Sequence, residues 1–235
     1  MIYTTSDLHG CPLTSVQKLL RLVDFSDEDF LFVLGDVIDR GEHGGELLLW
    51  LTEQPNVQLI LGNHEALLLA CDFLFEEVND DSLARLDIGK MELLENWIQN
   101  GGGPTIKSLH RIMRSSPELL EGILDYLRDA PLYEEVVIDE RRYVLVHSGL
   151  GNFKQQKMLS DYEPDELLMA RPSINTRYFD SDTTVVFGHT PTFLFGDEYQ
   201  GKMLKTDTWC CIDTGAAVGN PPMLFRLNDG AEFYL

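Results

Sequence analysis

The chain has 235 residues, and 18 lysines and arginines against 39 aspartates and glutamates give it a formal net charge of −21. This balance argues against nucleic acid as a partner and against an anionic membrane surface, because both are bound through clustered basic side chains. Hydrophobic residues make up 44% of the chain, which excludes a disordered protein. The length fits one large domain, and we expect a single domain over residues 1–235.

The uncharged apolar runs are far shorter than the roughly 20 residues that a membrane-spanning helix needs. The four cysteines, two of them adjacent at Cys210 and Cys211, lack the C-x-x-C spacing of thiolate metal sites and indicate no disulfide framework. We therefore expect no spanning segment, no signal peptide and a cytoplasmic location.

Short apolar segments followed by polar residues and glycine occur three times near the start of the chain. Residues 2–5, 30–34 and 57–61 have the length and composition of buried strands. Residues 12–23 and 46–52 lie between them and carry the apolar spacing of helices, so the three strands should be parallel. This alternation is typical of α/β proteins, which bind ligands at the carboxyl ends of their strands.

A helical block and then further strands are predicted for the rest of the chain. Residues 66–130 are mostly helical by pattern, with helical spacing over 82–100 and 117–129. The segments that fit strands are residues 134–138 and 142–146, which form a hairpin, and residues 184–187, 203–205, 209–212, 223–227 and 232–235. The expected fold is α/β with a helical insertion at about residues 66–130.

Polar side chains of the kinds that bind manganese, iron or zinc follow five of these predicted strands. A single histidine at a strand end is usually no more than a hydrogen-bonded residue. However, the pattern Gly-Asp-x-x-Asp-Arg-Gly at residues 35–41 fixes five positions and arises by chance in on the order of one chain in several thousand. The candidate ligands are Asp7, His9, Asp36, Asn63, His147 and His189.

Five motifs, taken in chain order, resemble those of the PPP-type serine/threonine protein phosphatases, in their bacterial and phage branch, within the calcineurin-like metallophosphoesterases. They are Asp-x-His-Gly at residues 7–10, the pattern at 35–41, Gly-Asn-His-Glu at 62–65, His-x-Gly at 147–149 and Gly-His-Thr at 188–190. Two departures are Ser6, where glycine is frequent, and Leu61, where many members have arginine. The resemblance implies two packed mixed β-sheets flanked by helices.

The resemblance also implies a dinuclear metal centre. Asp7, His9 and Asp36 would hold the first ion, and Asp36, Asn63, His147 and His189 the second. A carboxylate with two anionic oxygens can bridge ions about 3.5 to 4 Å apart, which suits Asp36. Manganese is the expected metal, with iron or zinc as alternatives, and a hydroxide that bridges the two ions would attack the phosphorus atom.

Four further residues receive roles from the same resemblance. Arg40 and Arg171 would bind the substrate phosphate, although each could instead be an ordinary solvated arginine. His64 would protonate the leaving oxygen, and Asp39 would hold the imidazole in the required tautomer. For Glu65 two roles stay open, a loop-orienting contact and an exposed carboxylate at a helix start.

Three functions remain in view. The first is a metal-dependent phosphomonoesterase, a protein serine/threonine phosphatase that could also accept phosphotyrosine, with a phosphoprotein or small phosphoester as partner. The alternative is a symmetrical dinucleoside polyphosphate hydrolase, which shares these motifs. The third is a binding protein that has lost turnover, against which the presence of both His64 and Asp39 argues. The lack of an obvious basic strip for a polyphosphate chain favours monoesters.

Overall fold

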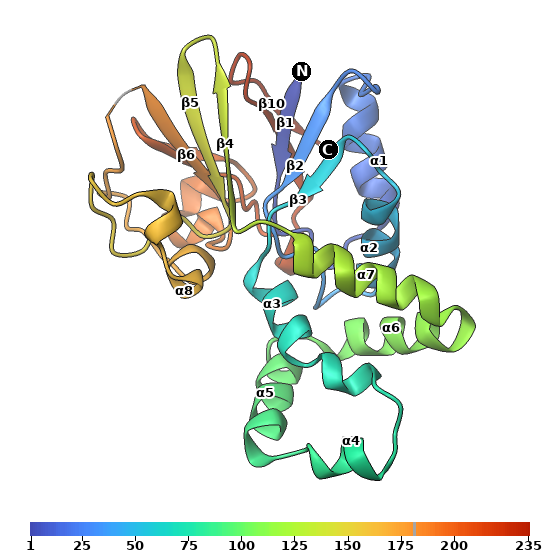
Figure 1. Ribbon diagram of the computed structural model, residues 1–235. Coiled ribbons are helices and arrows are strands. Elements are labelled where there is room, and N and C mark those ends of the chain that lie inside the picture. Colours follow the sequence, from blue (N-terminus) through green and yellow to red (C-terminus); the bar gives the residue numbers. More distant parts are fainter. Residues whose placement is uncertain (181) are drawn as a thin grey trace.

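The computed structural model describes residues 1–180 and 182–235. Two five-stranded sheets lie face to face, with helices outside them (Figure 1). The strand order is β10-β9-β1-β2-β3 in the first sheet and β4-β5-β6-β8-β7 in the second. Buried side chains such as Phe32, Leu145 and Phe225 fill the space between the sheets. The predicted α/β fold with two packed mixed sheets is confirmed.

The first sheet begins with the predicted parallel strands. β1 (Ile2–Thr5), β2 (Phe30–Val33) and β3 (Val57–Leu59) pair in parallel, and α1 (Leu13–Leu22) and α2 (Gly44–Thr52) connect them. Both helices bury apolar side chains against the outer face of this sheet. Two antiparallel strands from the end of the chain complete the sheet, β9 (Met223–Arg226) and β10 (Glu232–Tyr234).

The second sheet contains the predicted hairpin. β4 (Tyr133–Ile138) and β5 (Arg141–Val146) are antiparallel over their whole length. β5, β6 (Thr183–Phe187) and β8 (Trp209–Cys211) are parallel, and β7 (Leu204–Lys205) is antiparallel at the edge. A loop region that includes the short helix α8 (Pro164–Leu168) covers the outer face of this second sheet.

Within the predicted helical block, residues 80–99 form the lower arm in Figure 1, whereas residues 103–129 pack against α2. The expectation of continuous helical spacing over residues 82–100 was wrong, because a new helix starts after Asp87, whose carboxylate accepts a hydrogen bond from the backbone N–H of Lys90 at 2.8 Å. The helices of the block are α3 (Asn63–Ala70), α4 (Asp80–Ala84), α5 (Ile88–Gln99), α6 (Gly103–Ser115) and α7 (Pro117–Asp129).

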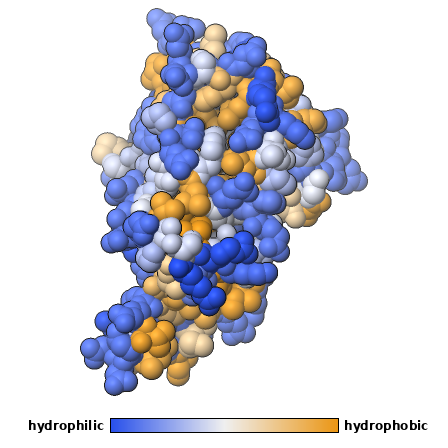
Figure 2. Space-filling view, turned by 90° about the vertical axis from the view of Figure 1, so that its right-hand side faces the viewer, coloured by the Kyte–Doolittle hydropathy of each residue, from blue (hydrophilic) through white to orange (hydrophobic). Residues whose placement is uncertain are grey.

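The surface is a mixture of hydrophilic side chains and scattered apolar ones (Figure 2). Some apolar groups lie over the arm at the lower end of this view. The exposed apolar side chains of α5 include Ile88, Met91 and Ile98. None of the helices in the described part of the chain is both long and apolar enough to cross a membrane.

Candidate metal centre

The carboxyl ends of β1, β2 and β3 in one sheet meet those of β5 and β6 in the other. Backbone hydrogen bonds join the segments that follow: the N–H of Asp7 donates to the carbonyl of Gly35 at 3.0 Å, and the N–H of Gly188 donates to the carbonyl of His147 at 2.7 Å. All six predicted metal ligands lie on these segments. The topology therefore brings together residues as far apart in the sequence as Asp7 and His189.

Two glycines of the motifs allow the segments to approach closely. A Cβ atom at Gly35 would lie 2.5 Å from the Cα of Gly62 and 2.6 Å from Nδ1 of His147, and the backbone of Gly35 has a φ of +79°. A larger residue at Gly35 would force the segments apart. The glycine before Asp36 thus sets how closely that carboxylate approaches its neighbours.

The first group of acceptors surrounds His9. Its Nδ1 lies 3.1 Å from the carbonyl oxygen of Ile38, so Nδ1 carries the proton and Nε2 is an acceptor. Nε2 lies 3.9 Å from Oδ1 of Asp7 and 3.7 Å from Oδ2 of Asp36. Asp7 is fixed by hydrogen bonds to its Oδ2 from the hydroxyl of Ser6 and the N–H of His189. Ser6, which stands where glycine is frequent in the family, therefore orients the candidate ligand Asp7.

The second group surrounds His147. Its Nδ1 donates to the carbonyl of Leu34 at 2.8 Å, which leaves Nε2 as an acceptor. That Nε2 lies 2.9 Å from Oδ1 of Asn63, 3.2 Å from Nδ1 of His189 and 3.4 Å from Oδ1 of Asp36. Acceptors that converge in a buried space repel one another unless a cation lies among them. The residues of this group fit a divalent metal ion.

Asp36 belongs to both groups, since Oδ2 faces His9 and Oδ1 faces His147. The compact sets of potential ligands are His9 with Asp36 and His64, and Asp36 with His147 and His189. Burial lowers the pKa of His9 and of His189 to about 3, so both imidazoles are neutral at physiological pH. Neutral imidazole is the form that coordinates metals.

The residues expected to handle the substrate lie beside the first group. Nδ1 of His64 lies 2.6 Å from Oδ2 of Asp39. Arg40 places Nη2 3.3 Å from Nε2 of His64 and Nη1 3.0 Å from Nε2 of His9. Burial lowers the pKa of His64, but the hydrogen bond to Asp39 and the charge of Asp36 outweigh burial, so this pKa is raised overall. Arg171 lies farther along the same edge, where Nη1 is 3.4 Å from Oγ1 of Thr190.

Three buried side chains contribute to this site in ways that the sequence did not reveal. The indole Nε1 of Trp97 donates to Oδ2 of Asp39 at 2.8 Å. The hydroxyl of Thr105 donates to Oδ1 of Asp39 at 2.6 Å. Burial, supported by the charge of Asp36, raises the pKa of Asp213 to about 7.

Glu65 orients a loop, and the alternative of an exposed carboxylate is wrong. Its buried carboxylate accepts hydrogen bonds from the backbone N–H groups of Asp36 at 2.8 Å and Val37 at 2.8 Å, and from those of Ile38 at 3.3 Å and Gly62 at 3.1 Å. These bonds hold the segment after β2 against the start of α3 and so fix the backbone of Asp36.

Two hollows open on different sides of the centre. One, of about 610 Å³, runs from His9 and Arg40 past His43 to the loop at Pro221. The other, of about 420 Å³, adjoins Asn63 and is lined by residues of α3, α5 and α8. A substrate that crosses the metal centre has room for a group at each end.

A bridging aspartate between two buried groups of acceptors, at one edge of a double sheet, is the arrangement of a metal-dependent phosphoester hydrolase. The chain belongs to the calcineurin-like phosphoesterases, whose family model matches residues 1–215. This confirms the superfamily that the motifs indicated. That family depends on metal ions, and the groups around Asp36 are the candidates for holding them here.

Similar curated proteins are bacterial. The symmetrical bis(5'-nucleosyl)-tetraphosphatase of Chromobacterium violaceum is 28% identical over 151 residues, which are 63% of this chain and 43% of that protein. The protein of the same name from Actinobacillus succinogenes is 32% identical over 151 residues, which are 63% of this chain and 44% of that protein. The match therefore spans less than half the length of either relative.

Two solved structures have the same fold. A "putative diadenosine tetraphosphatase" has a TM-score of 0.66 at 19% identity, covering 100% of this chain and 92% of the other. A variant of a cold-active protein tyrosine phosphatase has a TM-score of 0.56 at 16% identity, covering 100% of this chain and 80% of the other. At these identities the likeness concerns the fold alone.

Proposed function

We propose that this chain hydrolyses dinucleoside polyphosphates symmetrically, with a dinuclear metal centre formed by the two groups around Asp36. The observation that carries this proposal is the pair of hollows beside His9 and Asn63, because a dinucleoside polyphosphate has a nucleoside at each end and its phosphates would lie between them. The names of the curated relatives support the same substrate class. The sequence had favoured a protein phosphatase, and the relatives support the alternative better.

The residues around Asp36 fit the roles that a two-metal hydrolysis requires. Asp7, His9 and Asp36 would hold one ion, and Asp36, Asn63, His147 and His189 the other. When bound, the ions supply an activated water and neutralise charge on the phosphate. Arg40 and Arg171 would bind phosphate oxygens, since guanidinium groups pair with them in a planar geometry.

His64 would complete the reaction by proton transfer. Its Nδ1 is held by Asp39, so Nε2 is the atom that can face a leaving oxygen. The raised pKa of His64 favours the protonated imidazole, which is the form that a general acid requires. Addition of one water across the central P–O–P bond of diadenosine tetraphosphate gives two ADP molecules, and the proton from His64 goes to the departing ADP.

A substrate panel tests the proposal. The full chain is incubated with diadenosine tetraphosphate, phosphoserine, phosphothreonine and phosphotyrosine peptides and para-nitrophenyl phosphate, each with Mn²⁺, Fe²⁺, Zn²⁺ or a chelator. We expect the highest kcat/KM for the dinucleotide, with ADP as the sole nucleotide product and no turnover with chelator. Formation of AMP and ATP would exclude symmetrical cleavage. Preference for phosphopeptides would restore the protein phosphatase hypothesis.

A further inference from the structure

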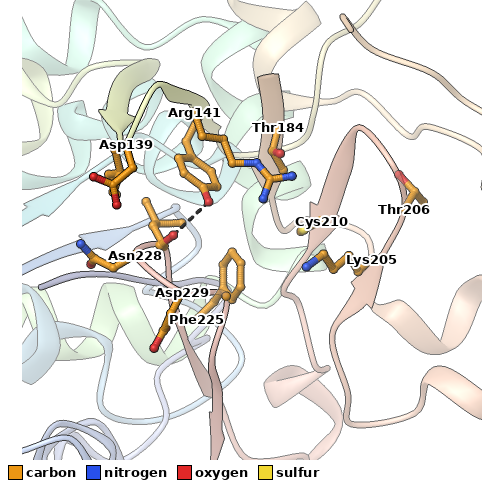
Figure 3. Close-up of a pocket in the computed structure, with 13 residues that line it drawn as sticks. Asp139, Arg141, Thr184, Lys205, Thr206, Cys210, Phe225, Asn228 and Asp229 are labelled. Carbon is orange, nitrogen blue, oxygen red and sulfur yellow. Dashed lines mark hydrogen bonds between the residues drawn. The ribbon is translucent and has the colours of Figure 1, made fainter. Parts of the chain in front are cut away.

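A third hollow, of about 260 Å³, lies between the two sheets (Figure 3). It is lined by the amino-terminal parts of β5 and β6, where Arg141 and Thr184 lie, and by Lys205 at the end of β7. β5 and β6 run from this hollow to His147 and His189. The hollow is therefore at the end of the strands opposite the metal centre, and it shares no lining residue with that centre.

Two cations point into this hollow from different strands. Figure 3 shows the guanidinium of Arg141 and the ammonium of Lys205 directed toward the space beside Thr184 and Cys210. Among the described residues, neither cation lies within ion-pair distance of a carboxylate.

The guanidinium of Arg141 lies over the ring of Tyr143, 5.9 Å from its centroid, and the carboxylates near the hollow leave both cations without an anionic partner. Of the two carboxylates at the hollow, Asp229 is already held by Arg226 through two bonds of 2.9 and 2.7 Å. The other, Asp139, lies in the exposed turn of the hairpin. The Tyr143 hydroxyl donates to the carbonyl of Leu227 at 2.9 Å.

The positive charges of Arg141 and Lys205 affect side chains inside the hollow. Burial raises the pKa of the Cys210 thiol to about 12, and the positive charges of Lys205 and Arg141 oppose this increase. Both cations therefore lie near a buried sulfur atom. The side chain of Thr184 is only 5% exposed, and its hydroxyl has no hydrogen-bond partner among the described residues, so it can donate to a ligand.

We propose that this hollow binds a small tetrahedral oxyanion of the phosphate type, held by Arg141, Lys205 and Thr184. Arg141 would form paired hydrogen bonds to two oxygens, Lys205 would contact a third, and the Thr184 hydroxyl would donate from the wall. A volume of about 260 Å³ accommodates such an ion with a few waters but not a nucleotide. The site is independent of the reaction at the metal centre.

Nuclear magnetic resonance tests the site directly. Sodium phosphate is titrated into the ¹⁵N-labelled full chain with diamagnetic Zn²⁺ present, at constant ionic strength maintained with sodium chloride. We expect saturable shifts of the amides of Thr184, Lys205 and Asn228, with a dissociation constant on the order of 1 mM. ADP should leave these amides unchanged, and saturable ADP shifts there would contradict the size limit.

Variants of equal charge separate this site from other anion sites. R141Q/K205Q should weaken phosphate binding at these amides at least about tenfold, and T184V, which keeps the shape of the side chain, about three-fold. R40Q/R171Q at the metal centre and K107Q/R111Q on α6 remove the same two charges and should leave the three shifts intact. Equal binding in R141Q/K205Q and wild type, or a loss in K107Q/R111Q of the same size, would overturn the proposal.

Discussion

His64 is the residue whose proposed role is most easily separated from metal binding. H64N keeps a polar side chain of similar size but removes the proton donor, so we expect kcat to fall by about 10²-fold or more while metal content is unchanged. The loss should be smaller for diadenosine tetraphosphate than for phosphoserine, because ADP leaves as a stable anion and an alkoxide does not. Turnover by stopped assay and metal content by elemental analysis check this.

Substitution of Asp36 should affect metal binding as well as activity, unlike substitution of His64. D36N removes the carboxylate that both groups of ligands share, so metal content and activity should fall together. The matched comparison is therefore H64N, which loses activity alone. If H64N lost metal and D36N kept two ions per chain, the division of roles between these residues would be wrong.

Asp39 controls the pKa of His64 and so the alkaline limit of activity. A general acid is active below its pKa, so kcat should fall as pH rises through the raised pKa of His64. D39N removes the hydrogen-bonding carboxylate, and this limit should move to lower pH. A pH profile of kcat for wild type, D39N and H64N measures the shift, and H64N should lack the limit altogether. An unchanged limit in D39N would show that another group titrates there.

The buried indole of Trp97 is expected to position the carboxylate of Asp39. Its Nε1 holds Asp39, whereas Trp209, which is equally buried, donates to the carbonyl of Thr176 away from the centre. W97F and W209F each lose one hydrogen bond and some volume, so both should be destabilised by about 2 to 4 kcal/mol. Only W97F should also lower kcat, by about tenfold. Equal kcat values in the two variants, measured below their unfolding temperatures, would argue against this role.

At the scale of elements, the segment between α5 and α6 links the helical arm to the catalytic motif. The carbonyl of Gly101 accepts a hydrogen bond from the N–H of Arg40 at 2.9 Å. A Cβ atom at Gly102 would lie 2.6 Å from Cδ1 of Trp97, whereas one at Gly103 would meet nothing within 4 Å. Close packing therefore requires glycine at residue 102 but not at residue 103.

Alanine substitutions in this segment should separate close packing from helix propensity. G102A should push Trp97 away from Asp39, lowering the free energy of unfolding by about 1 to 3 kcal/mol and reducing kcat. G103A, at the first position of α6, should leave activity unchanged and stabilise the chain by about 0.5 to 1 kcal/mol. Chemical denaturation and steady-state kinetics measure both effects. Identical behaviour of the two variants would contradict the packing argument.

The sequence predicted the elements whose signals are local. The hairpin was evident because Asp139, Glu140 and Arg141 separate two short apolar runs, and α7 begins at Pro117 with a clear helical stripe. The break before Asp87 was missed, because a helix cap at an exposed aspartate produces little change in hydrophobic spacing. The candidate metal ligands were found through motifs, whereas the contact of Trp97 with Asp39 joins positions 58 apart and leaves no local pattern.

At the scale of the whole molecule, an acidic chain must attract an anionic substrate to one place. The net charge of −21 repels polyphosphates in general, but this repulsion is screened beyond about 8 Å at physiological salt. Near the centre, Arg40 and Arg171 add positive charge, and divalent ions would add more than Asp7 and Asp36 remove. The metal centre would thus have a positive potential in an otherwise negative protein, and the size of this potential would depend on the bound ions.

The buried titratable groups predict how the stability of the metal-free chain depends on pH. Burial, together with the charge of Asp36, raises the pKa of Glu65 and of Asp213 to about 7, whereas unfolded carboxyl groups titrate near 4. Between these two pKa values, the folded state therefore binds more protons than the unfolded state. The free energy of unfolding should consequently decrease as pH rises through 7. The lowered pKa values of His9 and His189 act in the opposite direction only below about pH 6.5.

Between pH 6.5 and 8, the metal-free chain should accordingly lose thermal stability as pH rises, while the chain loaded with Mn²⁺ should show little change, because divalent ions stabilise the ionised carboxylates. Calorimetry with a chelator or with Mn²⁺ at several pH values measures the difference. D213N removes one of the titrating groups and should flatten the metal-free curve, whereas D207N, an exposed aspartate paired with Arg177, should not. A metal-free chain whose stability rose across this range would mean that these buried carboxyls are already ionised without metal, and the centre would then need another source of compensating positive charge.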